Sequence, residues 1–225
     1  GVHDLIWGRL TSSMLIPNNS TTARSQYIHP RVEPEICFRI AKDITGELNE
    51  TEVIEYVDAV TAAIEIIDSR YQNFKFSLED VVADNCSSIG FAVGDWMPVQ
   101  ESLNNLSMEL IIDDKTVAAG SSNDIMNNPW KSLAAATRLA AKYGEPIKKG
   151  MYIMAGAATN AEFIQANQTA SAKVNTLGEV SVSFRWTIDQ SQLKHLGPLI
   201  TQTPSPYKNK KGHLTVPQLW IIKLN

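Results

Sequence analysis

Three glutamates stand in segments that otherwise resemble buried β-strands. Glu33 and Glu35 lie two residues apart in the strand-like segment 28–42, so both side chains project from one face of an extended strand. Glu65 lies among alanines and isoleucines in a second apolar segment. Burying neighbouring carboxylates is costly unless a cation compensates their charge. The sequence therefore predicts a divalent metal held by Glu33, Glu35 and Glu65.

The residues alone leave two other interpretations open. Glutamate at positions i and i+2 is also typical of the solvent face of an amphipathic strand. As a strand residue, Glu65 could instead form an ion pair with Arg31 or Arg39. Both alternatives predict a structural role in place of a metal site.

Composition limits the class of protein. The 225 residues, 44% of them hydrophobic, are enough to bury a sizeable core in one large domain or two small ones. A net charge of −4 gives no electrostatic footprint for nucleic acid. The two cysteines show no metal-ligand spacing, and no apolar run reaches the roughly 18 residues of a membrane span. With no secretory signal in the sequence, we expect a cytoplasmic protein without nucleic-acid or membrane partners.

The chemistry-bearing segments must be positioned by a mixed set of elements. Asn49 and Glu52 form a capping-box pattern that predicts a helix to about residue 60, followed by a strand to Ile67. The Asn128-Pro129 start and Gly144 end predict a helix over 130–143. Further strands are expected at 89–94, 107–118 with a turn at 113–115, 151–155 and 179–186.

These elements predict an α+β fold, with a mixed, mainly antiparallel β-barrel-like core and flanking helices. Residues 187–225 differ in composition, being rich in proline, lysine and asparagine between 202 and 212. We expect them to form an appended C-terminal tail of unclear role and not a continuation of the sheet.

Three segments, taken in order, resemble a known family. They are His29-Pro30-Arg31-Val32-Glu33-Pro34-Glu35, the stretch 65–76 (EIIDSRYQNFKF) and the stretch 81–88 (VVADNCSS). Together they resemble the hydratase/decarboxylase branch of the fumarylacetoacetate hydrolase superfamily, over about residues 1–186. The resemblance implies a fumarylacetoacetate hydrolase-like fold and Mg²⁺ or Mn²⁺ held by Glu33, Glu35 and Glu65.

The resemblance also implies an activity. It favours metal-dependent decarboxylation of 2-oxo-3-hexenedioate to 2-oxopent-4-enoate and CO2, in meta-cleavage catabolism of aromatic compounds. Phe74 stands where hydratases of the branch tend to have Trp, and Ile6 stands where they usually have Asp. The alternative is a 2-oxopent-4-enoate hydratase, because both chemistries use a metal-stabilised dienolate.

Further site residues follow from the same resemblance. The predicted catalytic residues, which would orient water or substrate, are Asp84, Asn85 and Ser87, and the predicted substrate-binding residues are Thr159, Lys75, Arg70 and Ile6. Asp84 and Asn85 could equally be turn residues, and Lys75 and Arg70 could be surface charges or members of structural ion pairs.

The chain also departs from the family pattern. Family members begin with a further, largely helical segment that includes a lysine reaching the active site, and Ala155 replaces the usual Thr or Ser. We therefore expect a catalytic domain over 1–186 that lacks the usual N-terminal segment. A homo-oligomer or a complex with a sibling hydratase is expected, and a non-catalytic or partial family member acting as a subunit partner stays an alternative.

Overall fold

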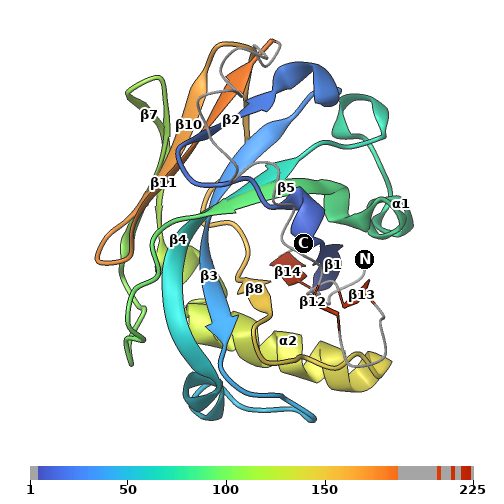
Figure 1. Cartoon of the computed structure of the whole chain (residues 1–225), viewed down its shortest axis with the longest axis vertical. Helices are drawn as coiled ribbons and strands as arrows, with labels where there is room; N and C mark the ends of the chain where they lie inside the picture. Colours follow the sequence, from blue (N-terminus) through green and yellow to red (C-terminus); the bar gives the residue numbers. More distant parts are fainter. Residues whose placement is uncertain (1–4, 187–206, 209–213, 216–218, 224–225) are drawn as a thin grey trace.

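A computed structural model describes residues 5–186, 207–208, 214–215 and 219–223, and two β-sheets dominate it (Figure 1). One sheet carries the predicted metal ligands. Its strands, in spatial order, are β1 (Ile6–Leu10), β14 (Leu219–Lys223), β8 (Tyr152–Met154), β3 (Arg31–Ile40), β4 (Val57–Ile67) and β5 (Ser88–Val93), with β9 (Glu162–Phe163) also paired to β3.

The second sheet lies against the first (Figure 1). Its order is β2 (Ser20–Ala23), β11 (Gly178–Arg185), β10 (Thr169–Val174), β6 (Ser107–Ile112) and β7 (Lys115–Ser121). A short pair, β12 (Tyr207–Lys208) and β13 (Leu214–Thr215), stands apart. In the described part of the chain only β8–β14 and β2–β11 pair in parallel, so the prediction of a mixed, mainly antiparallel core is confirmed.

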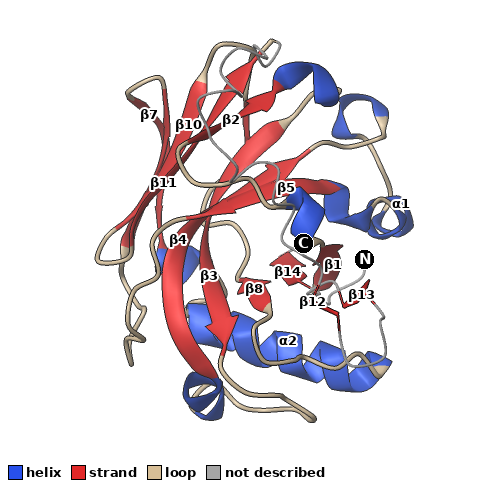
Figure 2. Ribbon diagram, in the orientation of Figure 1, coloured by secondary structure: helices blue, strands red, loops and turns tan. Residues whose placement is uncertain are grey.

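Helices are few (Figure 2). They are α1 (Leu78–Ala83), α2 (Pro129–Tyr143) and the 3-10 helices η1 (Ser12–Met14), η2 (Arg24–Gln26), η3 (Glu52–Tyr56), η4 (Gln72–Phe74), η5 (Asn85–Ser87) and η6 (Ser122–Asp124). The α+β class is therefore confirmed. The expectation of a barrel-like core is corrected, because each described sheet has two free edges and neither closes on itself.

Strand β3 separates the core from the carboxylates. Ile36, Phe38 and Ile40 are fully buried on one face, within the hydrophobic core that β10 and β11 help to build against β3 and β4. The other face presents Glu33 and Glu35. Burial of both faces gives the strand its continuous apolar sequence, in which the two glutamates are the exception.

The predicted helix from Asn49 to about residue 60 is wrong in type and length. The capping contacts exist, since the Glu52 N–H donates to Asn49 Oδ1 at 3.0 Å and the Asn49 N–H donates to Glu52 Oε2 at 2.8 Å. Only the five-residue η3 follows, and β4 begins at Val57. The β-branched run from Val57 onward is satisfied by pairing along β3, which outweighs local helix propensity.

Helix α2 matches its prediction. The Trp130 N–H donates to the Asn128 side chain at 3.0 Å, and Gly144 ends the helix with φ 68°. The Trp130 ring lies 4.8 Å from that of Phe38, and the α2 residue Ser132 donates its hydroxyl to the Ala155 carbonyl at 2.6 Å. Helix α2 thereby holds the end of β8, which leads into the loop beside the glutamates.

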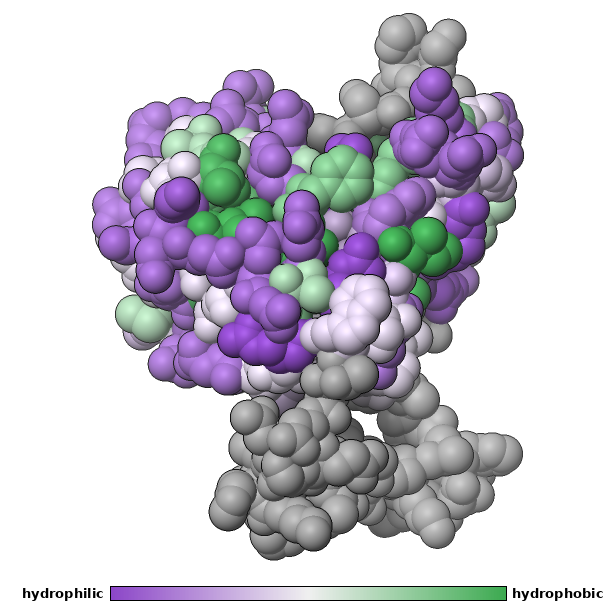
Figure 3. Space-filling model, turned by 90° about the horizontal axis from the view of Figure 1, so that it is seen from above, coloured by the Kyte–Doolittle hydropathy of each residue, from purple (hydrophilic) through white to green (hydrophobic). Residues whose placement is uncertain are grey.

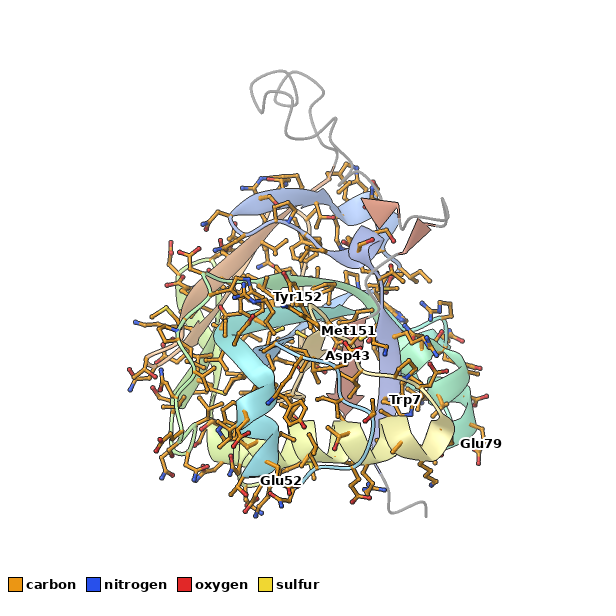
Figure 4. All side chains as sticks on the ribbon, turned by 60° about the horizontal axis from the view of Figure 1, so that its bottom comes forward. Trp7, Asp43, Glu52, Glu79, Met151 and Tyr152 are labelled. Carbon is orange, nitrogen blue, oxygen red and sulfur yellow. The ribbon has the colours of Figure 1, made fainter. Side chains whose placement is uncertain are left out.

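Strand β1 lies near the C-terminal end of α2 (Figure 4), where the rings of Trp7 and Tyr143 are 6.3 Å apart. Viewed from above, exposed hydrophobic residues form small groups between hydrophilic ones (Figure 3), as is usual for protein surfaces. Within the described residues, no helix is both long enough and apolar enough to cross a bilayer.

The segment 187–225 is described only in β12, β13 and β14. Strand β14 lies between β1, to which it pairs antiparallel, and β8, to which it pairs parallel. The expectation that this segment does not continue the sheet is therefore corrected for Leu219–Lys223. A strand inserted there satisfies backbone groups of β1 and β8 that would otherwise face an open edge. Residues 187–206, 209–213, 216–218 and 224–225 of the predicted tail lie outside the described residues.

The contact between β7 and the loop after β8 yields a stability prediction. A Cβ at Gly120, in β7, would lie 2.5 Å from the Ala158 carbonyl oxygen, whereas a Cβ at Gly46 would meet nothing within 4 Å. We expect Gly120→Ala to lower the free energy of unfolding by about 1–3 kcal/mol, because backbone must shift to admit the methyl group. Gly46→Ala is the control, expected to change it by less than about 0.5 kcal/mol. Equal effects of the two substitutions in urea unfolding would contradict the close approach.

Candidate metal centre

The strand register brings the three glutamates together. In the antiparallel β3–β4 ladder Glu33 lies directly opposite Glu65, and Glu35 is next along the same face of β3. One carboxylate oxygen from each of Glu33, Glu35 and Glu65 lies within 4.8 Å of the other two. Glu33 is 8% exposed, and Glu35 and Glu65 are fully buried. The cluster is therefore an enclosed group of like charges and not the solvent face of a strand.

Two neighbouring groups orient these carboxylates. The Ser88 hydroxyl, at the start of β5, donates a short hydrogen bond to Glu65 Oε1. The Gly156 N–H, in the loop after β8, donates to Glu35 Oε2 at 2.8 Å. Donors of this kind restrict the rotation of a carboxylate and leave its other oxygen to face the centre of the cluster.

The donor set suits a hard divalent cation. Mg²⁺, Mn²⁺ and Ca²⁺ prefer carboxylate oxygens, and oxygens bound to one such ion at about 2.1–2.5 Å are at most about 5 Å apart. The separations among Glu33, Glu35 and Glu65 lie within that limit. These residues could thus hold a divalent metal, and the charge of the ion would offset the repulsion among them.

The ion-pair alternatives for Glu65 are not what the structure shows. Arg39 pairs with Asp58, Nε to Oδ1 at 2.6 Å. The Arg31 guanidinium contacts two aromatic rings, 4.5 Å from the centre of Phe74 and 4.1 Å from that of Phe163. Each arginine that could have compensated Glu65 has a different contact.

Cys37 continues the carboxylate face of β3 after Glu35. It is fully buried in a small apolar cluster with Leu10, Ala63, Phe91 and Met154. Burial, and then the negative charge of Glu35, raise the pKa of the Cys37 thiol well above its ordinary value. The thiol is therefore protonated at neutral pH, and it belongs to an apolar cluster beside the glutamates.

Asp84 has a dense set of structural partners. Its carboxylate forms an ion pair with the Arg70 guanidinium and accepts hydrogen bonds from the hydroxyls of Ser69, at 3.3 Å, and Ser87, at 3.1 Å. The Asp84 side chain is 4% exposed. Arg70, predicted to bind substrate, is thus committed to Asp84 here. A role of Asp84 or Ser87 in orienting water or substrate stays a prediction.

Asn85 fastens β1 to the same loop. Its side chain accepts from the Arg9 N–H at 2.8 Å and donates to the Arg9 carbonyl at 2.9 Å. Asn85, Cys86 and Ser87 have φ of 53°, 56° and 59°, a left-handed run that non-glycine residues rarely adopt. The Asn85 and Asp84 contacts hold this strained turn directly before Ser88, the residue that contacts Glu65.

The predicted substrate-binding residues are spread over several places. Ile6 packs with Val81 and Cys86 in an apolar cluster, and Lys75 is exposed. Thr159 lines an open pocket of about 510 Å³ between β7 and the 157–162 loop. None of the three glutamates lines that pocket. Substrate contact by these residues stays a prediction.

Three contacts near the site were not predicted from the sequence, where Arg31 was considered only as an ion-pair partner of Glu65. Ser88 and the Gly156 N–H reach the carboxylates from segments distant in sequence, and no local pattern marks them. Arg31 could have been found, because it precedes Glu33 by two residues and must share its face of β3.

The cluster predicts that Glu35→Gln affects stability differently in the absence and in the presence of a divalent metal. Glu35→Gln removes one of three mutually repelling charges, so we expect the metal-free protein to be at least as stable as wild type. Saturating Mg²⁺ should stabilise wild type by about 2–3 kcal/mol at a hundredfold excess over Kd, and leave the variant unchanged. Thermal unfolding with and without MgCl2 measures both effects. Glu109→Gln, in the second sheet, is the control, and an equal Mg²⁺ shift in Glu35→Gln would exclude the site.

Asp84 generates a second prediction. Asp84→Asn should lower the free energy of unfolding by about 2–3 kcal/mol, because it removes the charge of a buried group that accepts several hydrogen bonds. Asp43→Asn is a matched control, since the Asp43–Lys148 ion pair, at 2.9 Å, is half exposed on both sides. We expect the control to lose far less stability in the same urea titration, because the exposed Asp43–Lys148 pair is screened by solvent. A comparable loss in both variants would contradict a structural role specific to Asp84.

Comparison with known proteins places this geometry in a family. The family described as fumarylacetoacetate (FAA) hydrolase C-terminal matches residues 2–185. The chain is 46% identical to a 4-oxalocrotonate decarboxylase from a Pseudomonas species, over 81% of this chain and 72% of that protein. It is 29% identical to a 2-keto-4-pentenoate hydratase from Paraburkholderia phymatum, over 82% and 71%.

A solved structure agrees. The 4-oxalocrotonate decarboxylase from Pseudomonas putida G7, complexed with magnesium and adipate, superposes with a TM-score of 0.75 at 29% identity, covering 82% of this chain and 78% of that one. The fold, the order of the segments and the sequence identity lead to one conclusion: the chain belongs to the fumarylacetoacetate hydrolase family, in which its decarboxylase and hydratase relatives are lyases.

Proposed function

We propose that the chain catalyses the divalent-metal-dependent decarboxylation of 2-oxo-3-hexenedioate (4-oxalocrotonate) to 2-oxopent-4-enoate and CO2. The observation that supports it most is the convergence of Glu33, Glu35 and Glu65 in a chain with high identity to a decarboxylase. The magnesium and adipate named for the solved relative are a hard cation and a six-carbon diacid, which match the cation and substrate proposed here.

Glu33, Glu35 and Glu65 would hold Mg²⁺ or Mn²⁺. When bound, such an ion supplies a Lewis acid for the 2-oxo group, on which negative charge accumulates as CO2 leaves. Ser88 and the Gly156 N–H keep Glu65 and Glu35 in fixed orientations, so the ligands need no reorganisation during the reaction.

The surrounding residues shape the environment of the reaction. Cys37, Phe91 and Met154 belong to a buried apolar cluster beside the glutamates. Its low dielectric strengthens electrostatic interactions of the neighbouring carboxylates. We retain Asp84, Asn85 and Ser87 as positioning residues, because their contacts hold the turn that presents the Ser88 hydroxyl to Glu65. Thr159, Lys75, Arg70 and Ile6 stay predicted substrate contacts.

Hydration of 2-oxopent-4-enoate is the second candidate function. The hydratase relative, at 29% identity over 82% of this chain, supports it. Both reactions place charge on the same 2-oxo oxygen, so the metal site alone does not separate them. The greater identity to the decarboxylase favours decarboxylation.

The family match over residues 2–185 also supports a catalytic domain over about 1–186, to whose sheet Leu219–Lys223 contributes β14. The two free, buried cysteines suit a reducing, cytoplasmic setting, which we propose for the protein. Self-association or association with a hydratase relative stays a prediction, and sedimentation of the purified chain with and without that relative would test it.

The proposed activity predicts Mg²⁺- or Mn²⁺-dependent release of CO2 from 2-oxo-3-hexenedioate, lost in Glu35→Gln. The loss is expected to reach a hundredfold or more, on the order of several kcal/mol of transition-state stabilisation by the metal. Two assays separate the candidate reactions. The first is manometric release of CO2 from 2-oxo-3-hexenedioate, and the second is the loss of absorbance of 2-hydroxypenta-2,4-dienoate, the tautomer of 2-oxopent-4-enoate. Metal-dependent dienoate loss without CO2 would assign the hydratase, and metal binding without either reaction would favour a non-catalytic subunit partner.

A further inference from the structure

We infer that Arg31 binds the second carboxylate of a diacid substrate and so selects diacids over monoacids. This inference deepens the proposed function and rests on it, because it names the residue that recognises the end of the substrate far from the metal.

Arg31 faces the same side of β3 as the metal cluster. It precedes Glu33 by two residues in an unbroken strand, so the two side chains project in the same direction about 7 Å apart along β3. Phe163 lies directly opposite Arg31 in the β3–β9 ladder and therefore shares this face. An anion held by Arg31 would lie beside the carboxylate cluster, at the end nearest Glu33.

The guanidinium is held by rings and not by an acid. Its central carbon lies 4.5 Å from the centre of the Phe74 ring and 4.1 Å from that of the Phe163 ring. The two rings are nearly perpendicular to one another, with planes 85° apart and centres 6.5 Å apart, so they contact the guanidinium on two adjacent sides, restrict its position and leave its other sides without a ring. Arg31 is half-buried and Phe163 is 53% exposed, so this contact lies at the edge of the protein surface.

Arg31 has no anionic partner in the described part of the chain. Its Nε is buried there without a hydrogen-bond acceptor, and no carboxylate of those residues lies within ion-pair distance. A carboxylate that accepts hydrogen bonds from the guanidinium would supply the anionic partner that Arg31 lacks among these residues. The site is thus preorganised for one planar anion.

The other arginines near the site are already engaged. Arg70 pairs with Asp84. Arg39 lies on the same face of β3 and is also stacked, 5.0 Å from the centre of the Trp96 ring, but it is paired with Asp58. Arg39 is therefore a matched control for Arg31: the same strand, the same face and a similar ring contact, without a vacant anion position.

The test compares two acids that differ only in the far carboxylate. Mg²⁺-dependent binding of 2-oxohexanedioate and of 2-oxohexanoate is measured by titration calorimetry for wild type, Arg31→Gln, Arg31→Lys and Arg39→Gln. Wild type should bind the diacid more tightly. Arg31→Gln should weaken the diacid about tenfold to a hundredfold and change the monoacid less than about twofold. Arg31→Lys should give an intermediate loss, because it keeps the charge without the bidentate edge.

The outcomes separate this inference from the proposed function. Equal weakening of both acids in Arg31→Gln, or the same diacid loss in Arg39→Gln, would overturn the role of Arg31 alone. Equal wild-type affinity for the two acids would do the same. If wild type bound neither acid in the presence of Mg²⁺, both the inference and the proposed function would fail. Arg31→Lys keeps the test decisive if Arg31→Gln does not fold.

Discussion

Burial of three like charges on one face of two paired strands is the constraint on which the site depends. Glu33 and Glu65 are opposite one another in the β3–β4 ladder, and Glu35 completes the cluster from the next position on its face. No arrangement of these side chains on that face can separate them, because strand register fixes their spacing. The fold therefore holds three carboxylates close enough to repel one another, and a divalent cation would offset that repulsion.

The surrounding structure keeps the three glutamates in position. The opposite face of β3 packs into the core between the two sheets, so the strand cannot rotate to release the glutamates into water. Ser88 and Gly156, from β5 and from the loop after β8, then orient two of the carboxylates. The strained turn at Asn85–Ser87, held through Asp84 and Arg9, sets the position of Ser88. Stability of the loop and geometry of the site are thus linked.

The arginines near the site differ in their partners. Arg39 and Arg70 are paired with Asp58 and Asp84, whereas among the described residues Arg31 contacts two aromatic rings and no carboxylate. Because the three glutamates and Arg31 share one face of β3, the proposed cation site and the proposed anion site lie side by side. A short diacid with a 2-oxo group is complementary to that pattern.

The sequence by itself determined which face of β3 would be charged, because a period of two in a strand leaves no other assignment for Glu33 and Glu35. It likewise determined helix α2, whose cap, proline and terminal glycine are local signals. The pairing of Glu65 opposite Glu33 and the contacts of Ser88, Gly156 and Arg31 were decided only by tertiary structure, since they join segments far apart in the chain. The same is true of η3, where pairing of β4 along β3 overrode a helix pattern, and of β14, whose place in the sheet depends on backbone groups that β1 and β8 leave available.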